Sequence, residues 1–246
     1  MASVTEIAPD VFRITTFNPT TRLSYSHFVI RDDEPVLYHA GLRSCFAELS
    51  EAAASVVDVQ KIRHIGFSHF ESDECGALND WLEAAPDAVA FTGPLCAATS
   101  LNDFAIRSPA VLGKDATLET GTKRFRLIPT PHLPHGWDSA MLFEESDRTL
   151  FVSDLFTDSG DPAPVIDSGL ADRAHQFLLR AEQSLFAHST NFNPSSRGQL
   201  EALAELGPKT LAVMHGSSFS GEGSQELLQL ASAMEDVFKK QAVIDG

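Results

Sequence analysis

Four potential metal ligands occur within one short segment of the sequence, GFSHFESDECG at residues 66–76, between a predicted strand and a predicted helix. Side chains at His69 and Glu71 point the same way on an extended backbone, whereas Asp73 and Glu74 lie where the chain turns. Such a strand-to-helix turn can bring these groups onto a metal, in a fold that alternates strands with helices. A solvated acidic helix N-terminus is the alternative, because acidic side chains are favoured there.

Three further segments place polar side chains at or directly after predicted strands. His132 and His135 follow a predicted strand at residues 123–128. Asp154 lies at the end of the apolar strand predicted from residue 149, and His215 follows the last predicted strand, at residues 210–214. In mixed α/β sheets, groups at strand ends gather along one edge, where ligands and catalytic residues are usually found. Four such segments in chain order favour a metal site over a solvated acidic turn.

The hydrophobic pattern predicts mixed sheets covered by helices. Strands are expected at residues 11–17, 27–31, 36–39, 64–67, 89–92, 123–128, 139–144, 149–155 and 210–214. Helices are expected at residues 42–57, 76–84, 170–189, 196–206 and 224–242, with a short helix after Pro94. Because neither a repeat nor a long linker interrupts the sequence, we expect one continuous domain over residues 1–246.

Charge and cysteine content narrow the function classes. The 34 acidic and 18 basic residues give a net charge of −16, which would repel nucleic acid and anionic membranes. The sequence lacks an apolar run of roughly 18 residues and a signal-like start. Cys45, Cys75 and Cys96 form no CxxC pair, which argues against a disulfide framework and a zinc ribbon. These features predict a cytoplasmic protein without a nucleic-acid or membrane partner.

In order and spacing, the four segments resemble the metallo-β-lactamase superfamily, which carries H-x-[HE]-x-D-H and then His, a bridging Asp and His in successive loops. Glu71 stands where the di-iron branch of that superfamily has Glu. The segments PHLPHGWD and HGSSF are similar to those of the smaller, flavin-free, oxygen-binding members of the branch. The resemblance implies an α/β, four-layer αββα sandwich of two mixed sheets. It also implies a chain with no fused flavodoxin domain and no FMN site.

The resemblance further implies a ligand set for two iron ions joined by an oxo or hydroxo bridge. It places His69, Glu71 and His135 on one metal, Asp73 and His215 on the other, and Asp154 between them. Glu74 departs from the family, which usually has His there. It is a candidate ligand, a candidate hydrogen-bond partner of metal-bound water, or a side chain that faces away. The residues that we expect to orient the ligands from behind are His132, Asp138 and His39.

The donor set can also be judged by its chemistry. Three imidazoles with three carboxylates are harder ligands than the His-rich sets typical of zinc hydrolases, so iron or manganese is favoured over zinc. If Glu74 also bound, a fourth carboxylate would stabilise the ferric state and lower the reduction potential.

Such a centre predicts a sensor or binding protein for dioxygen. With an external electron donor it would reduce dioxygen or nitric oxide, and the resemblance implies a homodimer. The alternatives are a dinuclear zinc hydrolase of esters, thioesters or lactams, and a metal-free interaction module. The metal content of the purified protein would distinguish the di-iron protein, the zinc hydrolase and the metal-free module.

Overall fold

Two seven-stranded sheets form the centre of the computed structural model, which describes residues 2–244. The first sheet runs β1 (Ser3–Ala8), β2 (Val11–Asn18), β3 (Leu23–Ile30), β4 (Val36–Tyr38), β5 (His64–Gly66), β6 (Val89–Thr92) and β7 (Ala110–Val111) in spatial order. The second runs β12 (Val165–Ile166), β14 (Ser218–Ser220), β13 (Thr210–Ala212), β11 (Thr149–Phe151), β10 (Ala140–Glu144), β9 (Arg124–Pro129) and β8 (Thr117–Glu119).

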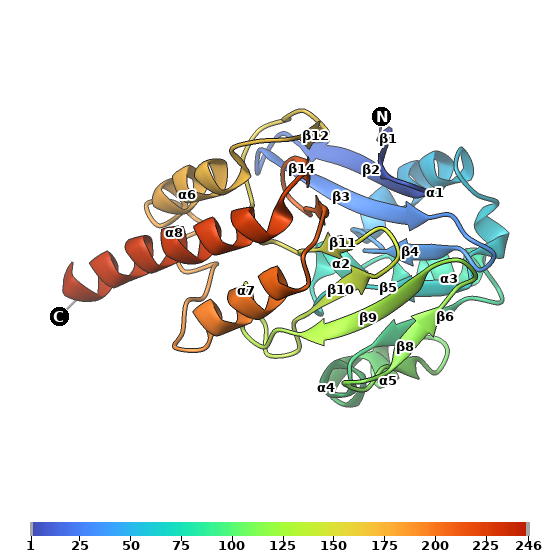
Figure 1. Cartoon of the computed structure of the whole chain (residues 1–246). Coiled ribbons are helices and arrows are strands. Elements are labelled where there is room, and N and C mark those ends of the chain that lie inside the picture. The colour runs from blue at the N-terminus through green and yellow to red at the C-terminus, as the bar shows by residue number, and fades with distance from the viewer. Residues whose placement is uncertain (1, 245–246) are drawn as a thin grey trace.

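Helices lie on the outer faces of both sheets (Figure 1). The first group contains η1 (Arg43–Cys45), α1 (Phe46–Ala54), η2 (Val59–Lys61), α2 (Ser72–Cys75), α3 (Leu78–Ala84), α4 (Pro94–Cys96), η3 (Ala97–Leu101) and α5 (Asn102–Phe104). The second contains α6 (Leu170–Ala181), α7 (Ser196–Glu205) and α8 (Gly223–Ile244). Within residues 2–244, no helix combines the length and apolar character that crossing a bilayer needs.

Three apolar layers hold these elements together and confirm the predicted αββα sandwich. Between the sheets, Phe28 of β3 packs edge-on against Phe151 of β11, with ring centroids 5.2 Å apart. One outer layer buries Leu49 and Trp81, from α1 and α3, against the first sheet. The other buries side chains of α6, α7 and α8 against the second sheet. Each sheet therefore has a helix-covered face and a face against its partner, as such sandwiches require.

Parallel pairing brings the candidate ligands to one edge of the sandwich. In the first sheet β4, β5 and β6 run parallel, with Leu37 opposite Ile65 and Ile65 opposite Ala90. In the second sheet β11 runs parallel to β13, with Phe151 opposite Ala212. Strands that run parallel end at the same edge, so the loops that follow β5, β11 and β13 converge there.

The predicted elements are found with shifted ends, and one helix is much shorter than its pattern indicated. The helix expected over residues 170–189 ends at Ala181, and an irregular segment follows until α7. Ser184 donates its hydroxyl hydrogen to the Ala181 carbonyl (2.9 Å), and Leu185 is 95% exposed, so no apolar stripe continues the helix. Strands β1, β7, β8, β12 and β14 were not predicted. Four of them have only two or three residues, too few for a periodic signal.

Asp32 ties the two sheets together through their loops. Its carboxylate accepts hydrogen bonds from the backbone N–H groups of Thr122 (3.0 Å) and Lys123 (2.9 Å) and from the Thr120 hydroxyl (2.7 Å). Slight burial opposes the charge, but these hydrogen bonds lower the pKa of Asp32 from 3.8 to about 2. The folded state therefore binds this proton less readily than the unfolded chain does.

Replacing Asp32 by asparagine is expected to lower the free energy of unfolding at pH 7 by about 1 kcal/mol, because charge-assisted hydrogen bonds are lost at a partly exposed site. The wild-type advantage is present above about pH 4 and disappears as the pH falls towards 2. Denaturant unfolding at several pH values measures it, with Asp33→Asn as the adjacent control. A difference that does not change over this range would contradict the assignment.

Candidate metal centre

The loop after β5 carries two of the candidate ligands, and its strand is fixed by close packing. A Cβ at Gly66 would lie 2.2 Å from Cζ of Phe91, so only glycine fits at this strand end. The extended backbone expected for residues 69–71 was wrong, because residues 68–70 bend and the Glu71 N–H donates to the His69 carbonyl (3.0 Å). Only Glu71 is extended before α2 begins at Ser72. His69 is buried, whereas the Glu71 side chain is about half exposed.

A first group forms around the Glu71 carboxylate. Its Oε2 lies 2.9 Å from Nε2 of His69 and 2.9 Å from Nε2 of His135. Oδ2 of Asp154 lies 3.3 Å from the same nitrogen of His135 and 3.7 Å from that of His69. Each of these four residues offers one potential ligand atom, and the four atoms all lie within 4.8 Å of one another. That spacing suits ligands of a single metal ion.

A second group forms around His215. Its Nε2 lies 3.3 Å from Oδ2 of Asp73 and 3.3 Å from Oδ1 of Asp154. Asp154 is thus shared, because Oδ2 faces the first group and Oδ1 faces the second. The Oδ1 atom is buried and has no hydrogen bond of acceptable geometry in the described chain, despite its closeness to His215. A buried carboxylate oxygen left in this state is suited to a cation.

The tautomer of His215 supports the same interpretation. Nδ1 lies 2.8 Å from the Ser24 carbonyl, which can only accept, so Nδ1 carries a hydrogen. In the neutral ring, Nε2 then presents a lone pair to two carboxylates. A proton or a metal ion must lie between these atoms, and the donor set fits a metal well.

Electrostatics in this cluster favour protons where metal ions would otherwise lie. Burial opposes a charged His69, yet the carboxylates of Glu74, Glu71 and Asp154 raise its pKa to about 10. Burial also opposes a charged His215, but Asp154 and Asp73 raise its pKa well above the usual value. Hydrogen bonds from His135 and His69 lower the pKa of Glu71 to about 2. Metal binding would displace these protons, so occupancy is coupled to pH.

The second sheet's His215 loop is held by the first sheet. The Ser24 hydroxyl of β3 accepts a hydrogen bond from the Gly216 N–H (3.0 Å), beside the bond between Ser24 and His215. The buried Arg13 of β2 donates from Nη2 to the Gly216 carbonyl (2.6 Å) and from Nε to the Ser26 hydroxyl (2.9 Å). These contacts orient the imidazole from outside its own sheet.

The remaining predicted residues lie around the cluster. His39 is buried, with Nε2 3.7 Å from Oε1 of Glu74. Asp138 accepts a hydrogen bond from the Phe70 N–H (3.0 Å), so its carboxylate fixes the loop between His69 and Glu71. His132 is exposed and lies outside the set of converging ligand atoms.

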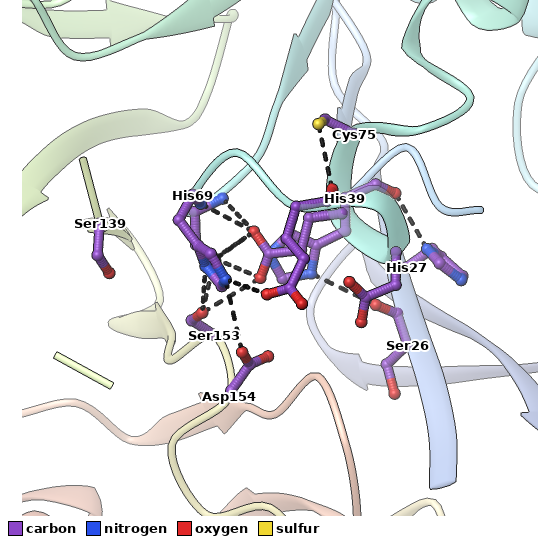
Figure 2. A network of polar contacts seen from close by, with 12 residues as sticks. Ser26, His27, His39, His69, Cys75, Ser139, Ser153 and Asp154 are labelled. Carbon is purple, nitrogen blue, oxygen red and sulfur yellow. Dashed lines mark hydrogen bonds and ion pairs between the residues drawn. The ribbon is translucent and has the colours of Figure 1, made fainter. Parts of the chain in front are cut away.

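Glu74 is fully buried, and its carboxylate is on the Nδ1 side of His69, where Oε2 lies 3.3 Å from that nitrogen. Sequence reasoning missed the two hydroxyls that share this space, those of Ser68 and Ser153. Figure 2 shows Ser153 and Asp154 close to the His69 ring. Both serines directly precede a candidate ligand, His69 or Asp154, and that position was the available signal.

A cavity of about 240 Å³ opens over the two groups. The candidate ligands that reach it are Glu71, Asp73, His135, Asp154 and His215. Its other walls are mostly apolar or uncharged and include Leu23, Tyr25, Leu42, Phe177, Phe186 and Thr190. Among the described lining residues there is no lysine or arginine. Phe186 and Thr190 come from the irregular segment that follows α6. Because the helix ends at Ala181, this segment can line the cavity.

The two mixed sheets, the helices outside them and the cluster at the strand ends define a metallo-β-lactamase-like fold with a candidate dinuclear metal centre. The family model described as ODP family beta lactamase matches residues 23–216, and the chain belongs to this family.

Individual relatives agree with this placement. Rubredoxin-oxygen oxidoreductase of Megalodesulfovibrio gigas is 25% identical over 210 residues, covering 80% of this chain and 50% of the relative. The chain thus spans half the length of that protein. The flavodiiron protein from Giardia intestinalis has a TM-score of 0.77 at 19% identity, over 96% of this chain and 60% of that one. The chemotaxis sensor ODP from T. denticola, in its apo state, has a TM-score of 0.73 at 19% identity, over 94% and 93% of the two chains.

Proposed function

We propose that this chain is a non-haem di-iron protein that binds dioxygen at the cluster of candidate ligands. The observation that carries the proposal is the arrangement of Asp154, whose two carboxylate oxygens face two separate groups of His and acidic side chains. One buried carboxylate between two donor groups is what a pair of metal ions needs.

The proposed ligands divide as the two groups do. His69, Glu71 and His135 hold one ion, Asp73 and His215 hold the other, and Asp154 joins them. Three imidazoles and three carboxylates form a hard donor set, and three negative charges nearly balance two ferrous ions. Iron is therefore preferred to zinc, with manganese as the nearest alternative. When bound, the iron pair would supply the redox chemistry and an open position for a small ligand.

The cavity supports a small uncharged ligand. Apart from the candidate ligands its walls give apolar and uncharged contact without a lysine or arginine, which suits dioxygen or nitric oxide better than an anionic ester, thioester or lactam. The names of the relatives, an oxygen oxidoreductase and a chemotaxis sensor of the ODP type, point the same way. We propose dioxygen sensing or binding first, and reduction of dioxygen or nitric oxide when an external redox protein supplies electrons.

The test is elemental analysis of protein purified without chelator, paired with an anaerobic visible spectrum before and after air is admitted. We expect two irons per chain and an absorption band that appears on exposure to air. Two zincs, no spectral change and failure of iron to replace zinc would overturn the proposal and favour a zinc hydrolase. Protein that takes up neither metal would favour an interaction module.

A further inference from the structure

Glu74 has a carboxylate that the proposed metal site does not use. It lies on α2 directly after Asp73, and its side chain is fully buried. Oε2 accepts hydrogen bonds from the backbone N–H groups of Ser68 (3.0 Å) and His69 (2.8 Å). The Ser68 hydroxyl also donates to this atom (2.6 Å), and the Ser153 hydroxyl donates to Oε1 (3.2 Å). The carboxylate therefore has hydrogen-bond donors on both oxygens from the protein interior.

The same carboxylate faces one edge of His69, while the metal groups face the other. Nδ1 of His69 is within hydrogen-bond distance of the Ser68 hydroxyl (3.2 Å) and the Ser153 hydroxyl (3.4 Å), and both hydroxyls donate to Glu74. Oε2 of Glu74 itself lies 3.3 Å from this nitrogen as an ion-pair contact. Nε2 of His69 lies 2.9 Å from Oε2 of Glu71. When Nδ1 carries a hydrogen directed at these hydroxyls and the Glu74 carboxylate behind them, Nε2 presents its lone pair to the first metal. A carboxylate behind a ligating imidazole fixes its tautomer and orientation and raises its basicity. Figure 2 shows this network around His69.

We propose that Glu74 is a positioning residue that holds His69 in its ligating tautomer and orientation, and that it is not a metal ligand. This inference rests on the proposed function, because it assumes that His69 binds a metal. It assigns a role to the one residue that departs from the motif of the resembling family. It also leaves the second metal with three protein ligands, Asp73, Asp154 and His215, beside the cavity that Asp73 and His215 line.

The experiment compares Glu74→Gln with Glu71→Gln, the same substitution three residues away on the metal side of His69. Competition titrations with Zn²⁺ and a chromophoric chelator give stoichiometry and affinity for wild type and both variants. In the diamagnetic Zn²⁺ forms, ¹⁵N–¹H NMR of the imidazoles reports which nitrogen of His69 carries hydrogen. Glutamine at 74 keeps an oxygen for the two N–H groups and an amide for the hydroxyls, so the fold is retained.

For Glu74→Gln we expect two Zn²⁺ per chain and an affinity at the first site lowered by about 10- to 100-fold. The His69 Nδ1–H resonance should shift upfield as the carboxylate that accepts from its two hydroxyl partners is replaced by an amide. For Glu71→Gln we expect a larger loss of affinity at the same site, with the Nδ1–H signal retained.

Two results would overturn the inference. Loss of Zn²⁺ from the second site in Glu74→Gln, with the His69 signal unchanged, would make Glu74 a ligand. Unchanged affinity and an unchanged signal would leave it without a role. A wild-type chain that fails to bind two Zn²⁺ would instead refute the dinuclear site itself, so the two failures are distinguishable.

Discussion

Protein carrying Asp154→Ala is expected to hold at most one metal ion per chain. Each proposed group loses one oxygen, because Oδ2 faces His135 and His69 while Oδ1 faces His215. The first group keeps three side chains, but the second keeps only Asp73 and His215. Metal analysis after dialysis against iron under anaerobic conditions measures the effect.

The matched control is Asp158→Ala, which removes a carboxylate four residues further on. Asp158 pairs with Arg180 at 3.6 Å and lies outside the cluster, so two metals should remain. Recovery of two metals per chain in Asp154→Ala would show that Asp154 does not join two ions. A folded far-UV circular dichroism spectrum in both variants excludes loss of structure as the cause.

His215→Ala is expected to empty the second site and to leave the first one occupied. His215 is the only imidazole in the second group among the described residues, and removing it leaves two carboxylates. We expect the stoichiometry to fall from two metals to one, and the absorption band on air exposure to disappear with it, since that band needs the pair. Elemental analysis and the anaerobic spectrum provide both readings.

His175→Ala on α6 serves as the control because this histidine pairs with Asp236 at 3.8 Å, away from the cluster. Its metal content and spectrum should equal those of wild type. Unchanged stoichiometry in His215→Ala would refute the role of His215. Loss of both metals would show that the two groups bind metal cooperatively through Asp154. That result would contradict the expectation that the first site stays occupied when the second is emptied.

Much of the fold was predictable because its longer elements carry strong periodic patterns. The helix at α3 and the strands β2, β9 and β10 lie close to the predicted ranges, since α3 buries side chains at helical spacing and the strands are strand-forming runs bounded by turns. Periodicity could not find β14 or the end of α6. The first has three residues, and the second depends on what the following segment covers.

The candidate site was predictable where side chains follow strands, and less so where they contact one another. The positions of His69, Glu71 and Asp154 at or after strand ends indicated that these side chains converge. Sequence could not choose among three environments for Glu74, because a shift of one helical residue decides whether its carboxylate faces a metal or the interior. The contribution of Arg13 was also hidden, since it acts across 203 residues of sequence.

The His215 imidazole is oriented by a strand of the opposite sheet, so its geometry depends on the contact between the two sheets. Ser24 of β3 holds Nδ1, and the Ser26 N–H donates to the Met214 carbonyl at 2.9 Å. Any breathing motion that separates the two halves must tilt the ring and loosen whatever ion it holds. The rate at which a chelator removes that ion would then follow the rate of amide hydrogen exchange at Ser26. Metal release would therefore report how often the two sheets separate.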